Sequence, residues 1–123
     1  MPAFSFLLLH VADHAASARF YNRLLGLPIL EQKDGFSTLP LRDGVMLGLW
    51  ERRTVEPASS GQTGASEVAL SVAGAAAVEA LHADWSAQGL PILQALTLMS
   101  FGTTFVAEDP DGHRLRVFAP PGA

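Results

Sequence analysis

The sequence contains no cysteine, which excludes disulfide bonds and thiolate catalysis and is compatible with a cytoplasmic location. It also lacks any apolar run near the roughly 20 residues that a membrane-spanning helix needs. The apolar stretch at residues 4–11 has no basic segment before it and no small-residue cleavage site, so we expect no secretion signal. A net charge of −4 argues against binding to a phosphate backbone. These absences predict a cytoplasmic protein whose partners include neither membranes nor nucleic acid.

The residues that are present suffice for one ordinary domain, because 49% of the 123 residues are hydrophobic and can bury a core. In the first half, Asp13 is placed as the N-cap of a helix that ends at Gly26, a residue typical of the position just past a helix. Short apolar runs precede and follow this helix in the sequence, and turn residues separate the runs that follow it. The pattern predicts strands at residues 4–11, 29–32, 36–41 and 45–50.

The second half repeats this order after a polar segment, residues 52–65, that reads as a linker. A helix is expected at 75–88, with strands at 67–72, 91–98, 103–107 and 114–118. The segment Gly-Leu-Pro-Ile-Leu follows the helix in both halves, at 26–30 and 89–93. The chain is therefore predicted to be one α+β domain, residues 1–123, built from two βαβββ modules at 1–51 and 66–123.

A tandem βαβββ pair resembles the vicinal-oxygen-chelate superfamily, which contains glyoxalase I, extradiol dioxygenases, fosfomycin-modifying enzymes and bleomycin-resistance proteins. Phe20-Tyr21 followed by Leu25-Gly26 is similar to the end of that superfamily's first helix, and the segment from Asp109 to His113 is similar to its last turn. The resemblance implies two curved sheets around a central cleft, with the helices outside. It also implies a homodimer.

Metal enzymes of that superfamily take one ligand from the first and one from the last strand of each module, and the resemblance puts these positions at Phe6, Gly48, Glu67 and Arg116. Only Glu67 can bind a metal ion, whereas a catalytic site needs at least three protein ligands. The four histidines show no paired ligand spacing. We therefore expect no metal, no cofactor and no conventional metalloenzyme.

If Phe6, Gly48, Glu67 and Arg116 face the cleft, strand alternation predicts which other side chains face it as well. The predicted lining consists of Phe6, Leu8, His10, Met46, Gly48, Trp50, Glu67, Ala69, Ser71, Arg114, Arg116 and Phe118. Such a surface suits a planar aromatic ligand, because the rings can stack and Gly48 lets a flat group approach the backbone. Glu67 and Arg116 are placed to form a buried pair, which either holds the structure together or contacts the ligand.

The segment from Leu47 to Trp50 resembles the strand that precedes the linker in phenazine-antibiotic resistance proteins of the superfamily, as do Asp84-Trp85 and the segment from Phe101 to Phe105. This resemblance implies that Trp50 is a stacking wall and Phe101 a nearby gate. The leading hypothesis is a metal-independent protein, without catalytic residues, that sequesters a planar or amphipathic antibiotic or toxin. The alternatives are a glyoxalase- or dioxygenase-type enzyme with an atypical metal site, such as Glu67 with His10, and a metal-free lyase or isomerase with Glu67 as base.

Overall fold

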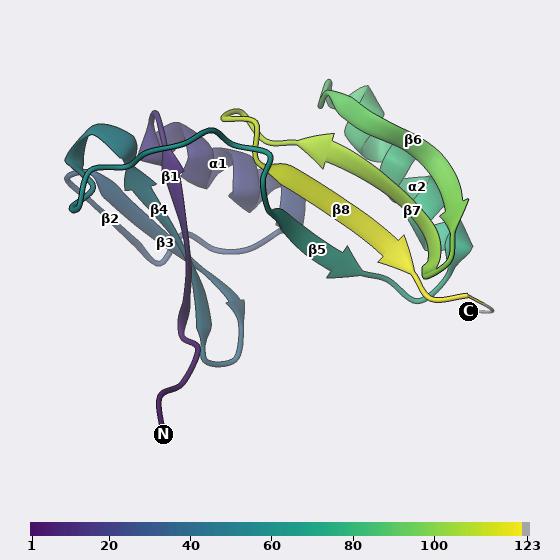
Figure 1. Cartoon of the computed structure of the whole chain (residues 1–123), viewed down its shortest axis with the longest axis horizontal. Helices are drawn as coiled ribbons and strands as arrows, with labels where there is room; N and C mark the ends of the chain where they lie inside the picture. The colour runs from purple at the N-terminus through teal and green to yellow at the C-terminus, as the bar shows by residue number, and fades with distance from the viewer. Residues whose placement is uncertain (122–123) are drawn as a thin grey trace. The chain divides into compact units, whose positions relative to one another are not determined.

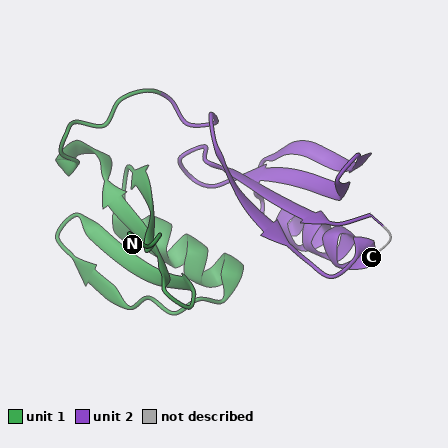
Figure 2. Ribbon diagram, turned by 60° about the horizontal axis from the view of Figure 1, so that its bottom comes forward, with its two compact units in different colours: residues 1–61 green, residues 62–123 purple. Residues whose placement is uncertain are grey.

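The computed structural model of the chain describes residues 1–121, which divide into two compact units between residues 61 and 62 (Figure 2). Each unit, as far as the structure describes it, contains one α-helix and one four-stranded sheet (Figure 1). None of the helices in the described part of the chain is long and apolar enough to cross a membrane.

The first unit runs in the order β-α-β-β-β, as predicted. Its elements are β1 (Phe6–Val11), α1 (His14–Leu25), β2 (Glu31–Lys33), β3 (Phe36–Arg42) and β4 (Val45–Glu51). The strands lie in the order β1-β4-β3-β2, and β1 runs parallel to β4 while the other pairs are antiparallel. A short 3₁₀ helix, η1 (Arg52–Thr54), follows β4.

The second unit repeats the first, which confirms the predicted α+β fold with tandem modules. It comprises β5 (Glu67–Ser71), α2 (Ala75–Ala87), β6 (Ile92–Met99), β7 (Gly102–Glu108) and β8 (Arg114–Ala119), with strand order β5-β8-β7-β6. The registers also agree, because Leu8 lies opposite Gly48 in the first sheet and Ala69 opposite Arg116 in the second. The duplicated sequence therefore encodes duplicated strand pairing.

Local chemistry sets the ends of α1. One carboxylate oxygen of Asp13 accepts hydrogen bonds from the backbone N–H groups of Ala15 and Ala16, each at 3.1 Å, which satisfies two donors that the first helical turn leaves unpaired. Gly26 ends the helix with φ of 69°, a conformation that glycine adopts without steric cost. Both predicted helix boundaries are confirmed.

The core of each unit lies between its helix and one face of its sheet. In the first unit Leu9, Val11, Leu47 and Leu49 of the sheet are buried, as are Phe20 and Tyr21 of α1. In the second unit the corresponding set is Leu115, Val117, Phe105, Val78 and Trp85. Trp85 is only 1% exposed, which confirms its predicted place in the core. Each such side chain contributes on the order of 2 kcal/mol through burial.

The segment predicted as a solvated linker packs in part against the first unit. Val55 is buried, the Arg52 guanidinium donates a hydrogen bond to the Gly61 carbonyl at 2.9 Å, and the Ser59 hydroxyl lies 2.7 Å from Nδ1 of His10. The contact between His10 and Ser59 joins residues 49 positions apart, so periodicity gave no sign of it.

Candidate functional site

An apolar pocket of about 450 Å³ lies on the face of the first sheet opposite α1, and its lining is Phe6, Leu8, Lys33, Phe36 and Trp50. Phe6 and Leu8 are each 43% exposed, whereas Leu9 and Val11 on the other face of β1 are buried. Alternation along β1 places them on this side, as the sequence predicted. The pocket thus presents large apolar groups to solvent where a folded protein normally buries them.

Two rings form adjacent walls of the pocket. Phe36 on β3 pairs directly with Trp50 on β4, and their rings meet edge to face with centroids 6.3 Å apart and an interplanar angle of 88°. This geometry is the one that aromatic quadrupoles favour. Trp50, one of the predicted site residues, lies at the pocket, whereas Phe36 and Lys33 were absent from the predicted set. Phe36 lies opposite Trp50 only because the ladder shifts register between Pro40 and Arg42, so counting back from the Asp43-Gly44 turn does not predict this pair.

Gly48 does not open the sheet to a flat ligand in the way the sequence predicted. A Cβ atom on this residue would lie 2.6 Å from Cδ2 of Leu8 and 2.9 Å from Cζ of Phe36. The space in front of Gly48 is therefore filled by these two side chains, and a flat ligand does not reach its backbone directly. The glycine instead lets Leu8 and Phe36 settle against the sheet as part of the pocket's lining.

His10 lies beside the pocket on the same face. Its ring meets the ring of Trp50 edge to face at 6.2 Å between centroids, and its Nδ1 atom contacts the hydroxyl of Ser59. Met46 pairs with Phe6 in the parallel ladder and is half-buried, outside the pocket's lining. Five of the predicted residues thus belong to this sheet: Phe6, His10, Met46, Gly48 and Trp50.

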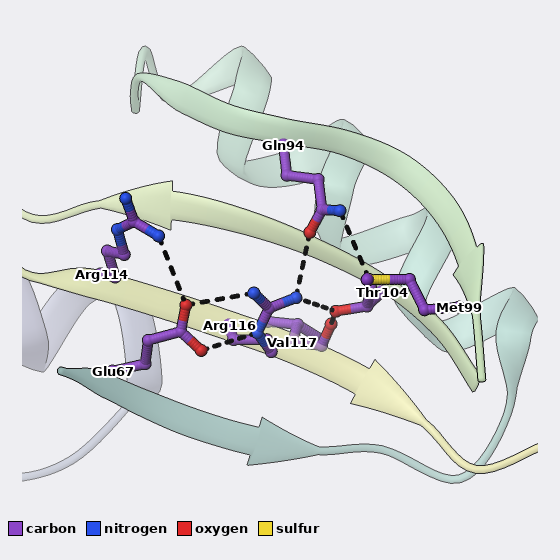
Figure 3. A network of polar contacts seen from close by, with 7 residues as sticks. All are labelled: Glu67, Gln94, Met99, Thr104, Arg114, Arg116 and Val117. Carbon is purple, nitrogen blue, oxygen red and sulfur yellow. Dashed lines mark hydrogen bonds and ion pairs between the residues drawn. The ribbon is translucent and has the colours of Figure 1, made fainter. Parts of the chain in front are cut away.

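The other four, Glu67, Phe101, Arg116 and Phe118, belong to the second unit. There Arg116 donates from Nε to Oε1 of Glu67 at 2.7 Å and from Nη2 to Oε2 at 3.1 Å, so the predicted pair forms with bidentate geometry (Figure 3). Arg114 adds a longer contact of 3.8 Å to the same carboxylate. The side chains of Glu67 and Arg116 are 29% and 18% exposed, so the pair is partly solvated rather than buried.

Further contacts fix the Arg116 guanidinium in place. Its Nη1 atom donates to Oε1 of Gln94 at 3.0 Å and to the hydroxyl of Thr104 at 3.2 Å (Figure 3). Its central carbon lies 5.6 Å from the centroid of the Phe101 ring, which in turn meets Phe118 edge to face at 6.1 Å. Phe101 thus contacts the arginine of the polar network.

The pKa of Glu67 is lowered from its ordinary value, chiefly by its hydrogen bonds with Arg116, while partial burial opposes this shift. The carboxylate is therefore ionised at neutral pH and already accepts two hydrogen bonds from one guanidinium. A general base needs a pKa near the working pH. These properties disfavour the alternative in which Glu67 abstracts a proton.

The positions equivalent to the metal ligands do not fit a divalent ion. Phe6 offers a phenyl ring, the space at Gly48 is filled, and both oxygens of Glu67 bind Arg116. Among residues 1–121, no group of three or more His, Asp or Glu side chains is placed to hold a metal ion. We therefore assign no metal-dependent step to these residues.

Known structures with this arrangement support the fold. The solution NMR structure of a protein from Agrobacterium tumefaciens is 44% identical, with a TM-score of 0.89 over 99% of this chain and 100% of that one. A glyoxalase-related enzyme from Fulvimarina pelagi is 21% identical, with a TM-score of 0.85 over 98% and 90% of the two chains. A glyoxalase/bleomycin resistance protein/dioxygenase from Nocardioides is 22% identical, with a TM-score of 0.83 over 100% and 87%.

The two structures near 20% identity show the fold alone. A comparison with curated protein sequences found no match. The family model described as Glyoxalase/Bleomycin resistance protein/Dioxygenase superfamily matches residues 3–117, nearly the whole length of the sequence. The chain therefore belongs to the glyoxalase/bleomycin resistance protein/dioxygenase superfamily.

Proposed function

We propose that this protein binds a flat aromatic small molecule, such as a phenazine, without a metal ion and lowers its free concentration. The observation that carries the proposal is the pocket of about 450 Å³ walled by Trp50, Phe36, Phe6 and Leu8. A pocket of this size is in the range that holds drug-sized ligands. Its walls are apolar and aromatic, which favours stacking with a planar molecule.

The chemistry of the lining also supports binding without catalysis. Lys33 is the one ionisable side chain among the residues that line the pocket. Its side chain is exposed and forms an ion pair with Glu31 at 3.4 Å. The network that contains Glu67 keeps its carboxylate ionised and bonded to Arg116. A binding protein needs no reactive group, and it protects a cell by mass action when its concentration matches that of the toxin.

Isothermal titration with phenazine tests the proposal. We expect one bound phenazine per chain and quenching of the tryptophan emission, because Trp50 lines the pocket whereas Trp85 is buried in the core. A Trp50→Ala variant should bind about tenfold more weakly, since it loses a stacking wall and its buried area. Phe4→Ala removes another exposed ring, one outside the pocket lining, and is the matched control. Equal affinity in wild type and Trp50→Ala would overturn the proposal.

Recovery of the ligand separates binding from turnover. The proposal predicts that phenazine extracted after incubation is chemically unchanged, as judged by mass spectrometry. A new product that accumulates with time would instead favour one of the enzyme alternatives. Stoichiometric metal in the purified protein, measured by elemental analysis, would identify the glyoxalase- or dioxygenase-type alternative.

A further inference from the structure

A second cleft, of about 430 Å³, lies in the first unit and differs from the apolar pocket in character. It is lined by Ala12, Arg52, Arg53, Val55, Ala58 and Ser59. Two arginines and a hydroxyl face this cleft, whereas the first pocket has apolar walls and a single lysine. The two hollows therefore suit different parts of a ligand, one apolar and one anionic.

Residues in β1 and just after it line both hollows. Leu8 of β1 lines the apolar pocket, and Ala12, the residue after the strand ends at Val11, lines the second cleft. His10 lies between them in sequence and shares the face of β1 that carries Leu8. The two residues of extended strand from Leu8 to His10 span about 7 Å. A molecule with a flat body and a tether of a few bonds can reach from one hollow into the other.

Side-chain contacts connect the two hollows through His10. Trp50, a wall of the apolar pocket, meets the His10 ring edge to face, and Nδ1 of His10 lies 2.7 Å from the hydroxyl of Ser59, which lines the second cleft. The histidine thus forms the boundary between the hollows. Because the Ser59 hydroxyl is held by His10, it is oriented before any ligand arrives.

The two guanidinium groups of the second cleft have different partners. Arg53 donates from Nε and Nη2 to one oxygen of Glu51, at 3.2 and 2.7 Å, so a carboxylate of the protein already takes part of its hydrogen-bonding capacity. Arg52 donates from Nη2 to the Gly61 carbonyl. Because its partner is a carbonyl rather than a carboxylate, Arg52 is the better placed of the two to bind the carboxylate of a ligand.

We propose that the ligand is a flat aromatic compound with a tethered carboxylate. Its rings occupy the pocket beside Trp50, and its tether passes His10. Its carboxylate accepts hydrogen bonds from Arg52 and, with Nδ1–H of His10 donating to the Ser59 oxygen, from the Ser59 hydroxyl in the second cleft. Guanidinium groups suit this role because their forked N–H donors match the two oxygens of a carboxylate. The inference rests on the proposed function for the rings and adds a separate site for the anion.

Matched dansyl probes test the inference by isothermal titration and by dansyl fluorescence. Dansylglycine and dansyl-ε-aminocaproate are each compared with the corresponding primary amide, which keeps the ring and the tether but has no charge. We expect the carboxylates to bind about fivefold more tightly than the amides, with the larger gain for the longer tether. The gain should shrink as the salt concentration rises.

Variants locate the gain in the second cleft. Arg52→Gln should abolish the preference for carboxylate over amide, and Arg52→Lys should keep part of it because the charge remains. Arg42→Gln is the matched control, since Arg42 is exposed at the end of β3 and outside both linings. A preference that survives in Arg52→Gln, or one that is lost equally in Arg42→Gln, would overturn the inference.

The two proposals fail in different ways. Amides that bind wild type and lose affinity in Trp50→Ala, together with carboxylates that bind no better than the amides, would refute the anion site and leave the flat-ligand pocket supported. Amides that do not bind at all would count against the pocket. In that case a titration with acetate, followed at the backbone amide of Ser59 by NMR, still decides the anion site, because absence of a shift contradicts it.

Discussion

Replacing Glu67 with glutamine removes the charge that pairs with Arg116 but keeps the shape of the side chain. Exposed ion pairs contribute about 0.2–1 kcal/mol, whereas removal of one partner from a buried pair costs about 3–5 kcal/mol. The side chains of Glu67 and Arg116 are 29% and 18% exposed and the pair is bidentate, so it lies between the exposed and the buried class. We expect Glu67→Gln to lower the free energy of unfolding by about 1–2 kcal/mol at pH 7.

The pH dependence has a definite sign. The pKa of Glu67 is lower in the folded protein than its ordinary value, so the folded state favours the ionised carboxylate. The contribution of Glu67 to the free energy of unfolding is fully present above the pKa of a glutamate in the unfolded chain, about 4.3. It is lost as the pH falls through the pKa of Glu67 in the folded protein. Glutamine does not titrate. The difference in stability between wild type and Glu67→Gln should therefore shrink below about pH 4.

Urea unfolding followed by circular dichroism, at neutral pH and at the lowest pH where both proteins remain folded, measures this difference. Glu79→Gln is the control, because Glu79 is an exposed residue of α2. A Glu67→Gln variant no less stable than the control at pH 7 would refute the reasoning, as would a difference that grows on acidification. We expect phenazine affinity to be unchanged, since Glu67 is not part of the pocket's lining.

Three further changes have expected outcomes. Asp13→Ala should lower stability by about 1 kcal/mol through loss of the helix cap, and Asp13→Ser should restore most of it in urea unfolding. Gly102→Ala should cost about 3 kcal/mol or more, measured in the same way, because Gly102 has φ of 128° and a Cβ there would collide with the Ala119 carbonyl oxygen. Gly48→Ala should displace the side chains of Leu8 and Phe36 into the pocket and weaken phenazine binding about tenfold in calorimetry. The free energy of unfolding should change by less than about 1 kcal/mol, because alanine is favoured over glycine within a strand and this gain offsets the displacement. Unaltered affinity in Gly48→Ala would show that the pocket's shape does not govern binding.

Local signals in the sequence were sufficient for the parts of the fold that depend on neighbouring residues. Asp13 and Gly26 predicted the ends of α1 because capping involves only the adjacent turns. Alternation along β1 predicted that Phe6 and His10 share a face, because each strand residue points opposite to the next. The repeat of Gly-Leu-Pro-Ile-Leu extended these assignments to the second unit.

Features that depend on long-range register were missed. Lys33 and Phe36 reach the pocket through strand pairing across the first sheet, and Ser59 reaches His10 from 49 residues away in sequence. In the second sheet, β6 pairs with β7 through two register shifts, after Ile92 and after Gln94. Such irregularities break simple alternation, so the bond from Arg116 to Gln94 was not foreseen although its pairing with Glu67 was.

Titration of phenazine into protein that has been dialysed against a strong chelator tests the central claim most directly, with tryptophan emission as the readout. We expect the affinity and the quenching to equal those of untreated protein, because the pocket binds the ligand through its own side chains, chiefly Trp50, Phe36, Phe6 and Leu8. Loss of binding on chelation, with recovery when a divalent metal ion is added, would contradict it.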